Sequence, residues 1–413
     1  MLMVMAVTAP PRTHELDVEV RERERAALPS VVWVLALGTF LMGTTEFVVA
    51  GLLPEISGDL GVSVARAGLL ITIFAVGMIV GAPLMTMLTL RLPRRRTLML
   101  ALAVFAAGHV IVALGSGFVL LLAARFLTAL ATGAFWAVAN VVASRAAGEA
   151  QSSRALGVVG AGAMFANVVG VPLGAFGGQV VGWRGPFWAL TVLAVLAIGL
   201  IARYVPHDAP DQQPVSIRSE LSALRSGRLW LVLGACAATT GGVLSTYTYI
   251  SPLLTDRAGV ASGLVPLVLA GFGVGALVGF IIGGRLGDVR PQATIIFAPV
   301  MTAVLLLVIC VVSSVAAPTI ALVAALGLGL GINPVLIALA VRFAGRAPTL
   351  GSALTVSAFN FGTAVGSWIA GITLDSSLGD TGPAVVGTVI AALTVIPTTA
   401  IVMTERRHSD VIN

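Results

Sequence analysis

Two charged residues lie deep inside long apolar runs of the sequence: Glu46 in the run 31–53 and Arg125 in the run 119–143. A helix that begins at Val31 and rises ~1.5 Å per residue carries Glu46 about 22 Å along its axis. An ionisable group at that depth in a bilayer costs a few kcal/mol unless it faces a protein interior or a watery cavity. A carboxyl group can bind and release a proton, whereas a guanidinium keeps its proton and only donates hydrogen bonds. We therefore predict that Glu46 carries a proton, and that Arg125 holds the hydrogen-bond network around it.

Each residue also has an alternative interpretation. Glu46 could be an acid that is permanently paired with a neighbouring donor. Arg125 could be a side chain that extends along its helix to reach the membrane surface.

Other polar and aromatic side chains inside the apolar runs could line a substrate cavity, because such cavities combine apolar surface with a few fixed polar groups. Any one of them could instead join two helices by a hydrogen bond. His109 is isolated in its run, and we expect packing or a backbone hydrogen bond for it, with a proton relay as the alternative. The predicted substrate wall is Glu46, Trp136, Asn140, Asn167, Tyr247, Tyr249, Asn333, Phe359, Asn360 and Phe361.

The elements that must position these residues are membrane-spanning helices. The sequence is 58% hydrophobic and 10% charged, and its mean hydropathy of +1.03 excludes a soluble domain with a polar exterior. We predict an all-α membrane protein with twelve transmembrane helices, at 31–53, 67–88, 97–115, 119–143, 155–179, 186–203, 229–251, 263–283, 292–313, 317–341, 350–372 and 381–403.

The distribution of basic residues predicts the orientation of these helices. All 24 basic residues are Arg. With a cytoplasmic amino terminus, 20 of them lie inside and three, Arg66, Arg184 and Arg257, lie outside. This bias places both termini in the cytoplasm. The net charge of +6 therefore reflects topology, and we expect no nucleic-acid partner. Cys236 and Cys310 predict neither a disulfide nor a metal site.

An internal repeat divides the chain into two halves. Shifting the sequence by 198 residues aligns AVGMIVG (75–81) with GVGALVG (273–279), and also Pro54 with Pro252. A parallel repeat of this kind predicts two six-helix bundles with a cavity between them near the membrane midplane. The expected parts are a cytoplasmic tail (1–30), a first bundle (31–203), a linker (204–228), a second bundle (229–403) and a second tail (404–413). In the linker, the spacing of apolar residues over 215–224 predicts an amphipathic helix.

Several motifs together resemble the major facilitator superfamily, and more narrowly its twelve-span drug:proton antiporters, the branch with chloramphenicol and sugar efflux proteins. They are GTTEFVVAGLLPEISGDLGVS (43–63), RLPRRR (91–96), AARFLTALATG (123–133), ANVVGVPLG (166–174), GWRGPFW (182–188) and GGRLGD (283–288). The resemblance covers nearly the whole chain after about residue 30. It implies that Arg125 takes part in proton transfer, although Thr128 and Ala129 stand where Gln and Gly are usual.

The resemblance also implies gating residues. Gly170, Pro172 and Gly174 would pack helices closely and seal the halves against leak, although Val171 separates the usual Gly-Pro pair. Gly284 and Asp288 would form a cytoplasmic latch with the cations of the first half, Arg91, Arg94 and Arg95. Leu90 stands where the first copy of this motif would carry its acid.

No phosphate-binding loop, metal motif or nucleophile with a base is present in the sequence, so an enzyme is not expected. We expect a proton-coupled antiporter of the plasma (inner) membrane that exports a small amphiphilic drug, most specifically chloramphenicol, as a monomer without cofactors. Export of an arabinose-like sugar or an endogenous metabolite is the alternative. A passive channel or a membrane sensor is a more remote one.

Overall fold

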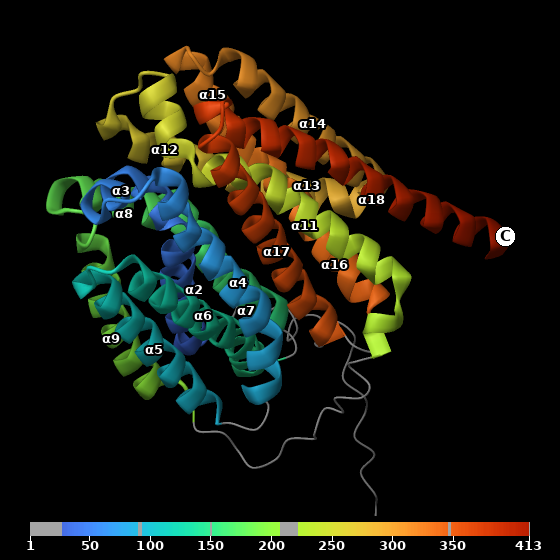
Figure 1. Ribbon diagram of the computed structural model, residues 1–413. Helices are drawn as coiled ribbons and strands as arrows, with labels where there is room; N and C mark the ends of the chain where they lie inside the picture. The colour runs from blue at the N-terminus through green and yellow to red at the C-terminus, as the bar shows by residue number, and fades with distance from the viewer. Residues whose placement is uncertain (1–26, 90–92, 149–150, 207–221, 346–347, 413) are drawn as a thin grey trace, which may run out of the picture.

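The computed structural model describes residues 27–89, 93–148, 151–206, 222–345 and 348–412, and the regular structure in these residues is helical (Figure 1). The amino-terminal elements are α2 (Ser30–Phe47), η1 (Val48–Gly51), α3 (Leu53–Leu60), α4 (Val64–Thr89), α5 (Arg94–Leu114), α6 (Phe118–Ala147), α7 (Ser152–Phe165), η3 (Ala166–Gly170), α8 (Val171–Val181) and α9 (Gly185–Tyr204). The later elements are η4 (Ser222–Arg225), α11 (Gly227–Thr248), α12 (Ile250–Pro252), η5 (Leu253–Arg257), η6 (Ser262–Leu264), α13 (Val265–Val289), α14 (Pro291–Val312), α15 (Ala316–Leu326), η7 (Gly327–Ile332), α16 (Asn333–Phe343), α17 (Pro348–Leu374), η8 (Gly379–Thr381) and α18 (Gly382–Ile412).

Eleven helical segments in the described residues are long and apolar enough to cross a membrane, so the chain is a multi-pass membrane protein. They agree with eleven of the predicted spans to within a few residues. The remaining predicted span, 350–372, is helical in α17 but is not among the eleven. Its Ser, Thr, Gly and Asn residues lower its hydropathy, and α17 packs along both α4 and α11. These small polar residues therefore pack between helices.

The helices form two groups, α2–α9 and α11–α18, which meet most closely at the end of the molecule where α3 and α12 lie (Figure 1). We call this the α3 end. Here one continuous hydrophobic core contains residues of both groups, among them Leu52, Leu53, Tyr249 and Leu269. Toward the opposite end the cores are separate: one is built only from residues 28–205 and another only from residues 229–401. The two groups are thus sealed together at the α3 end.

Glycines of the fifth predicted span bring it close to the first. A methyl group on Gly170 would overlap the hydroxyl of Thr44, and one on Gly174 or Gly178 would overlap Val48 or Leu52. These three glycines recur every four residues and so share one helix face. That face packs within the amino-terminal group. Contact with the other group comes from the preceding turn, where Asn167 lies against the backbone of Gly273, and from α8 itself, where Gln179 donates a hydrogen bond of 2.7 Å to the carbonyl of Ser262.

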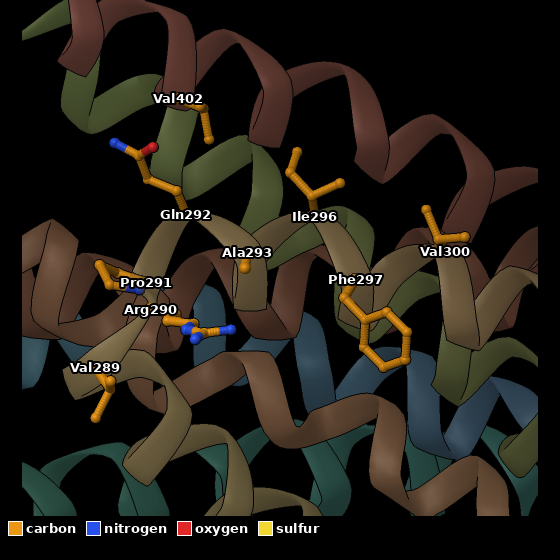
Figure 2. A pocket seen from close by; sticks show the side chains of 9 residues that line it. All are labelled: Val289, Arg290, Pro291, Gln292, Ala293, Ile296, Phe297, Val300 and Val402. Carbon is orange, nitrogen blue, oxygen red and sulfur yellow. The ribbon is translucent and has the colours of Figure 1, made fainter.

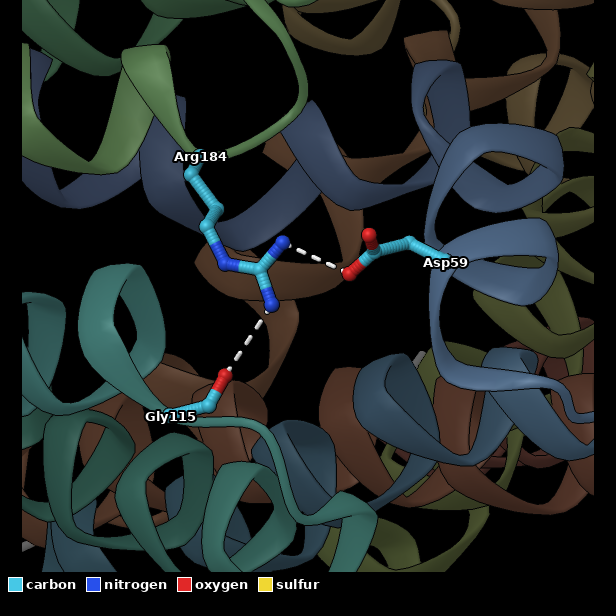
Figure 3. A network of polar contacts seen from close by, with 3 residues as sticks. All are labelled: Asp59, Gly115 and Arg184. Atoms are coloured by element: carbon cyan, nitrogen blue, oxygen red, sulfur yellow. Dashed lines mark hydrogen bonds and ion pairs between the residues drawn. The ribbon is translucent and has the colours of Figure 1, made fainter.

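An ion pair fastens three helix ends of the amino-terminal group. Arg184, before α9, donates a hydrogen bond of 2.6 Å to Asp59 of α3 and one of 3.2 Å to the carbonyl of Gly115 after α5 (Figure 3). Its guanidinium also lies 4.2 Å from the ring centroid of Trp183. The hydrogen bond and charge of Arg184 lower the pKa of Asp59 below its ordinary 3.8.

A groove of about 790 Å³ lies between the start of α14 and the distal part of α18 (Figure 2). Its walls are mainly apolar, with Phe297 and Val300 on one side and Val402 on the other, and Arg290 at one end. Among the side chains that the structure describes, none of those that line the groove is acidic.

Some predictions fall outside the described residues. These are the tail 1–26, most of the predicted linker helix 215–224, the side chain of Asp288, and Arg91. Of the linker, Ser222–Arg225 forms a short 3₁₀ segment.

Candidate functional site

Glu46 lies one residue before the end of α2, where the first span changes from an α-helix to the 3₁₀ turn η1. The residues before it, Gly43, Thr44 and Thr45, are buried, and Glu46 itself is half-buried. Its carboxylate has no hydrogen bond to any residue of the described chain. The structure thus shows no hydrogen-bond donor paired with Glu46 among the described residues.

Arg125 of α6 is the charged residue that interacts electrostatically with Glu46, and their opposite charges attract each other. Arg125 is 2% exposed, so it does not extend to the membrane surface. Its Nη1 donates to the carbonyl of Thr45 at 2.9 Å and to the Thr45 hydroxyl at 3.0 Å, and its Nε donates to the carbonyl of Leu70 at 3.3 Å. The guanidinium also lies over the ring of Phe74, with Cζ 4.2 Å from the ring centroid. Arg125 thus joins α2, α4 and α6.

One guanidinium nitrogen of Arg125 does not take part in these hydrogen bonds. Nη2 is buried and has no hydrogen-bond partner in the part of the chain that the structure describes. A buried donor without an acceptor costs about 1–3 kcal/mol. The site therefore contains an unpaired donor and, on Glu46, an unpaired acceptor, and it can gain free energy when the two meet each other or a bound ligand.

Sequence reasoning missed Thr45 and gave His109 no part in this network. The imidazole Nε2 of His109 lies 2.8 Å from the Thr45 hydroxyl, and its Nδ1 lies 2.7 Å from the carbonyl of Phe105. The backbone hydrogen bond expected for His109 is present, but the ring also reaches the residue that binds Arg125. The available signal for Thr45 was its position next to Glu46.

Several predicted substrate residues are only partly buried. Trp136, Asn140, Asn167, Asn333 and Phe359 are half-buried. Trp136 packs on a small cluster of Phe74, Met78 and Ala129, and Val356 of α17 packs on the same cluster from the other group of helices. Trp136 is thereby connected, through Phe74, to the guanidinium of Arg125. The two groups therefore also meet at this cluster, next to Arg125.

Two amides in the carboxy-terminal group have free acceptors. Oδ1 of Asn333 and Oδ1 of Asn360 are buried without a hydrogen-bond partner within the described ranges, while Nδ2 of Asn360 donates to the carbonyl of Val356 at 3.0 Å. These oxygens can accept hydrogen bonds from a ligand hydroxyl or amide.

Tyr247 and Tyr249 lie in the seal at the α3 end. The ring of Tyr247 makes an edge contact with Phe47, the neighbour of Glu46, at a centroid distance of 6.0 Å. The hydroxyl of Tyr249 is buried between the two groups, 3.2 Å from the carbonyl of Ser367 and 3.4 Å from that of Ala65. Thr72 and Ser367 add a hydrogen bond of 2.8 Å across the same boundary.

Phe361 lies apart from the other predicted substrate residues. It is 55% exposed, and Trp368 and Ile372, seven and eleven residues further along α17, are exposed to the same degree. Residues at this spacing form one helix stripe. An exposed apolar stripe on a membrane helix suits contact with lipid, so we leave Phe361 out of the proposed site.

The predicted gating residues lie away from the charged pair. Arg95 donates a hydrogen bond to the carbonyl of Ala202 and so joins the start of α5 to the end of α9. Its neighbour in the sequence, Arg94, is half-buried. In α13, a methyl group on Gly284 would touch only Pro334 at 3.9 Å, whereas Gly283 and Gly287 are in close contact with Gly331 and Val335. The tight packing of this segment therefore falls on the neighbours of Gly284.

The structure is an all-helical membrane protein of two helix groups, with a half-buried carboxylic acid, Glu46, and a buried guanidinium, Arg125, inside the amino-terminal group. The sequence model of the Major Facilitator Superfamily matches residues 35–367. The chain belongs to this family, and it is a transporter rather than an enzyme.

Individual relatives agree with this assignment. The chain is 34% identical over 360 residues to a chloramphenicol resistance protein of Streptomyces lividans, covering 86% of this chain and 92% of the relative. It is 32% identical over 357 residues to the uncharacterized MFS-type transporter YtbD of Bacillus subtilis, covering 85% and 90%. A probable sugar efflux transporter of Mannheimia succiniciproducens is 30% identical over 367 residues, covering 88% and 92%.

The fold is also similar to that of a solved structure. A bacterial homologue of the human lysosomal transporter Spinster, in an inward-facing and occupied conformation, superposes with a TM-score of 0.74. The match covers 91% of this chain and 96% of that one, at 16% identity.

Proposed function

We propose that this protein is a proton-coupled antiporter that exports a small amphiphilic drug by alternating access, and that chloramphenicol is its substrate. The observation that carries the proposal is the pair of Glu46 and Arg125, in which a half-buried carboxylate without a hydrogen bond lies near a guanidinium with a free Nη2. The relationship to a chloramphenicol resistance protein supports the choice of drug.

The coupling step follows from the chemistry of this pair. A proton that arrives from outside binds the carboxylate of Glu46 and removes its negative charge, so the attraction to Arg125 weakens. Release of the proton to the cytoplasm restores the charge, and the carboxylate then binds Nη2 or a donor of the incoming substrate. Because Arg125 does not release its own proton, it acts by holding a fixed positive charge beside the acid.

The substrate site that we propose lies between the two groups of helices, next to this pair. Trp136 supplies apolar contact through the cluster that it shares with Phe74. Asn333 and Asn360 supply the free acceptors for ligand hydroxyl or amide groups. Asn140, Asn167, Phe359 and Tyr247 complete the proposed wall. A neutral molecule with several hydrogen-bond donors fits this chemistry better than a dication, because the site contains only one acid.

The architecture that we propose has twelve spans in two six-helix bundles, with α17 as the twelfth span. The protein acts as a monomer in the inner membrane with both termini in the cytoplasm, so the α3 end faces outward. The shared core at the α3 end and the separate cores beyond it support a state that is closed to the outside. Gating in this scheme involves the close packing of Gly170, Pro172 and Gly174 and a latch of Asp288 with basic residues of the first bundle.

The direct test measures chloramphenicol inside cells that express the protein, before and after an uncoupler collapses the proton gradient. We expect low internal chloramphenicol with the gradient and equilibration with the medium without it. Unchanged internal chloramphenicol relative to cells without the protein contradicts the substrate assignment. Exclusion that persists after the gradient collapses contradicts proton coupling.

A second candidate is export of a sugar, since the chain is also related to a probable sugar efflux transporter. Addition of arabinose-type sugars separates the two functions. If chloramphenicol export is absent and labelled sugar is expelled in a gradient-dependent way, the sugar is the substrate.

A further inference from the structure

His109 completes a chain of hydrogen bonds that ends at Arg125. His109 lies in α5 and is 2% exposed. Its ring stacks on that of Phe105, with the ring centroids 4.0 Å apart, and its centroid lies 5.8 Å from that of Phe187. Both of its ring nitrogens have partners, the Phe105 carbonyl and the Thr45 hydroxyl. The ring therefore has no freedom to turn without breaking two hydrogen bonds.

The direction of each hydrogen bond follows from which atoms can donate. A carbonyl oxygen only accepts, so Nδ1 of His109 carries a hydrogen and donates to Phe105. In the neutral ring, Nε2 is then an acceptor, and the Thr45 hydroxyl donates to it. This leaves the lone pairs of the Thr45 oxygen available to accept from Nη1 of Arg125 at 3.0 Å.

The result is one ordered sequence from Arg125 through Thr45 to His109. A cationic His109 would have to donate to Thr45 from Nε2, and the Thr45 hydroxyl would then lose its acceptor at this site. Only the neutral ring satisfies all three groups together. The Thr45 hydroxyl and carbonyl then form two adjacent acceptors for one guanidinium nitrogen, which fixes the plane of the guanidinium.

We propose that His109 is a positioning residue for proton coupling: as a neutral acceptor it orients the Thr45 hydroxyl, which in turn fixes the guanidinium of Arg125 and leaves its Nη2 without a partner. This inference rests on the proposed antiport. It gives His109 no proton to carry. His109 and Thr45 hold Arg125 in place, and Arg125 is the group that the carboxylate of Glu46 can bind when it loses its proton.

Paired variants separate positioning from packing. His109→Gln keeps an acceptor near the position of Nε2, whereas His109→Met fills similar space without one. Thr45→Ser keeps the hydroxyl, whereas Thr45→Val removes it at nearly constant volume. Thr191→Val is the matched control, because Thr191 is a buried threonine of the same group whose hydroxyl bonds only to its own helix, at the carbonyl of Phe187.

The experiment uses purified full-length protein in proteoliposomes and measures two activities with chloramphenicol. One is uptake driven by a proton gradient, and the other is exchange of labelled for unlabelled drug without a gradient. We expect His109→Met and Thr45→Val to lower driven uptake about tenfold, the factor that corresponds to about 1.4 kcal/mol, while KM and exchange stay near wild type. His109→Gln, Thr45→Ser and Thr191→Val should retain driven uptake within about twofold.

The combined variant His109→Met with Thr45→Val should lose no more than either single variant, because both break one chain of hydrogen bonds. If His109→Gln falls as far as His109→Met, or if exchange falls together with driven uptake, His109 has a packing role and the inference is overturned. Wild-type driven uptake by His109→Met also overturns it. If Glu46→Gln retains driven uptake, the proposed antiport itself fails, which is a different result.

Discussion

The guanidinium of Arg125 attracts the carboxylate of Glu46 but forms its hydrogen bonds with the backbone carbonyls of Leu70 and Thr45 and with the Thr45 hydroxyl. A charge that is anchored by other groups stays in place when its counter-charge is neutralised. In the proposed mechanism, Glu46 gains and loses a proton while Arg125 keeps these hydrogen bonds.

Replacement of Arg125 tests the geometry of its anchoring. Arg125→Lys keeps the charge but loses the planar fork that reaches Leu70 and Thr45 at once. We expect proton-driven transport to fall at least about tenfold, equivalent to about 1.4 kcal/mol, and Arg125→Gln to fall further. Transport rates in proteoliposomes measure this. A lysine variant with wild-type transport shows that the charge alone is sufficient.

The contact between Thr72 and Ser367 offers a test of alternating access. Their hydroxyl oxygens lie 2.8 Å apart on α4 and α17, so cysteines at both positions come close enough for a disulfide. We expect oxidation of the pair, with Cys236 and Cys310 replaced, to stop transport, and a reductant to restore it. Each single cysteine variant is the control. Full transport by the cross-linked protein contradicts opening at the α3 end.

Asn360 tests the proposed substrate site. Its Nδ2 bonds within its own helix, and its Oδ1 is free. Asn360→Gln retains an amide donor and acceptor, whereas Asn360→Leu removes both. We expect the leucine variant to raise the KM for chloramphenicol about tenfold, with the glutamine variant closer to wild type, because one ligand hydrogen bond is lost. Equal KM values for the three proteins remove Asn360 from the site.

The ion pair of Asp59 and Arg184 should affect stability and depend on pH. Arg184 holds the pKa of Asp59 below its ordinary 3.8, so the pair stabilises the folded state above that value, and this stabilisation disappears as the pH falls through the lowered pKa. Because both side chains are partly exposed, we expect Asp59→Asn to cost only about 0.2–1 kcal/mol at neutral pH. Thermal unfolding in detergent from neutral pH down to about pH 3 measures this. A difference that grows as the pH falls contradicts the assignment.

The sequence was sufficient to predict the helical class and most spans, because long apolar runs have no other stable form in a bilayer. It located Glu46 and Arg125, since charges stand out against such runs. It did not connect Thr45 and His109 to them, because that link joins residues 64 positions apart and depends on the rotation of α5 about its axis. The same limit applies to Phe361, whose apolar side chain is compatible with a cavity or with lipid until the helix orientation is known.

The glycine spacing in the sequence predicted that two helices pack closely, but it did not predict which helix is the neighbour. The spacing of Gly170 and Gly174 indicated a close helix approach, and the structure places it against the first span. Contacts of this segment across the two groups instead involve other residues, such as Asn167 with Gly273 and Gln179 with Ser262. A repeat of small residues marks a face that can approach a neighbour, but it does not identify that neighbour.

The measurement that tests the central proposal most directly is proton movement driven by substrate alone. Proteoliposomes with a trapped pH indicator and no initial pH gradient are given an outward chloramphenicol gradient. With wild-type protein, we predict that efflux of the drug acidifies the lumen as protons enter in exchange. Glu46→Gln should exchange labelled chloramphenicol yet produce no pH change. Lumenal acidification by Glu46→Gln at the wild-type rate would contradict Glu46 as the proton carrier.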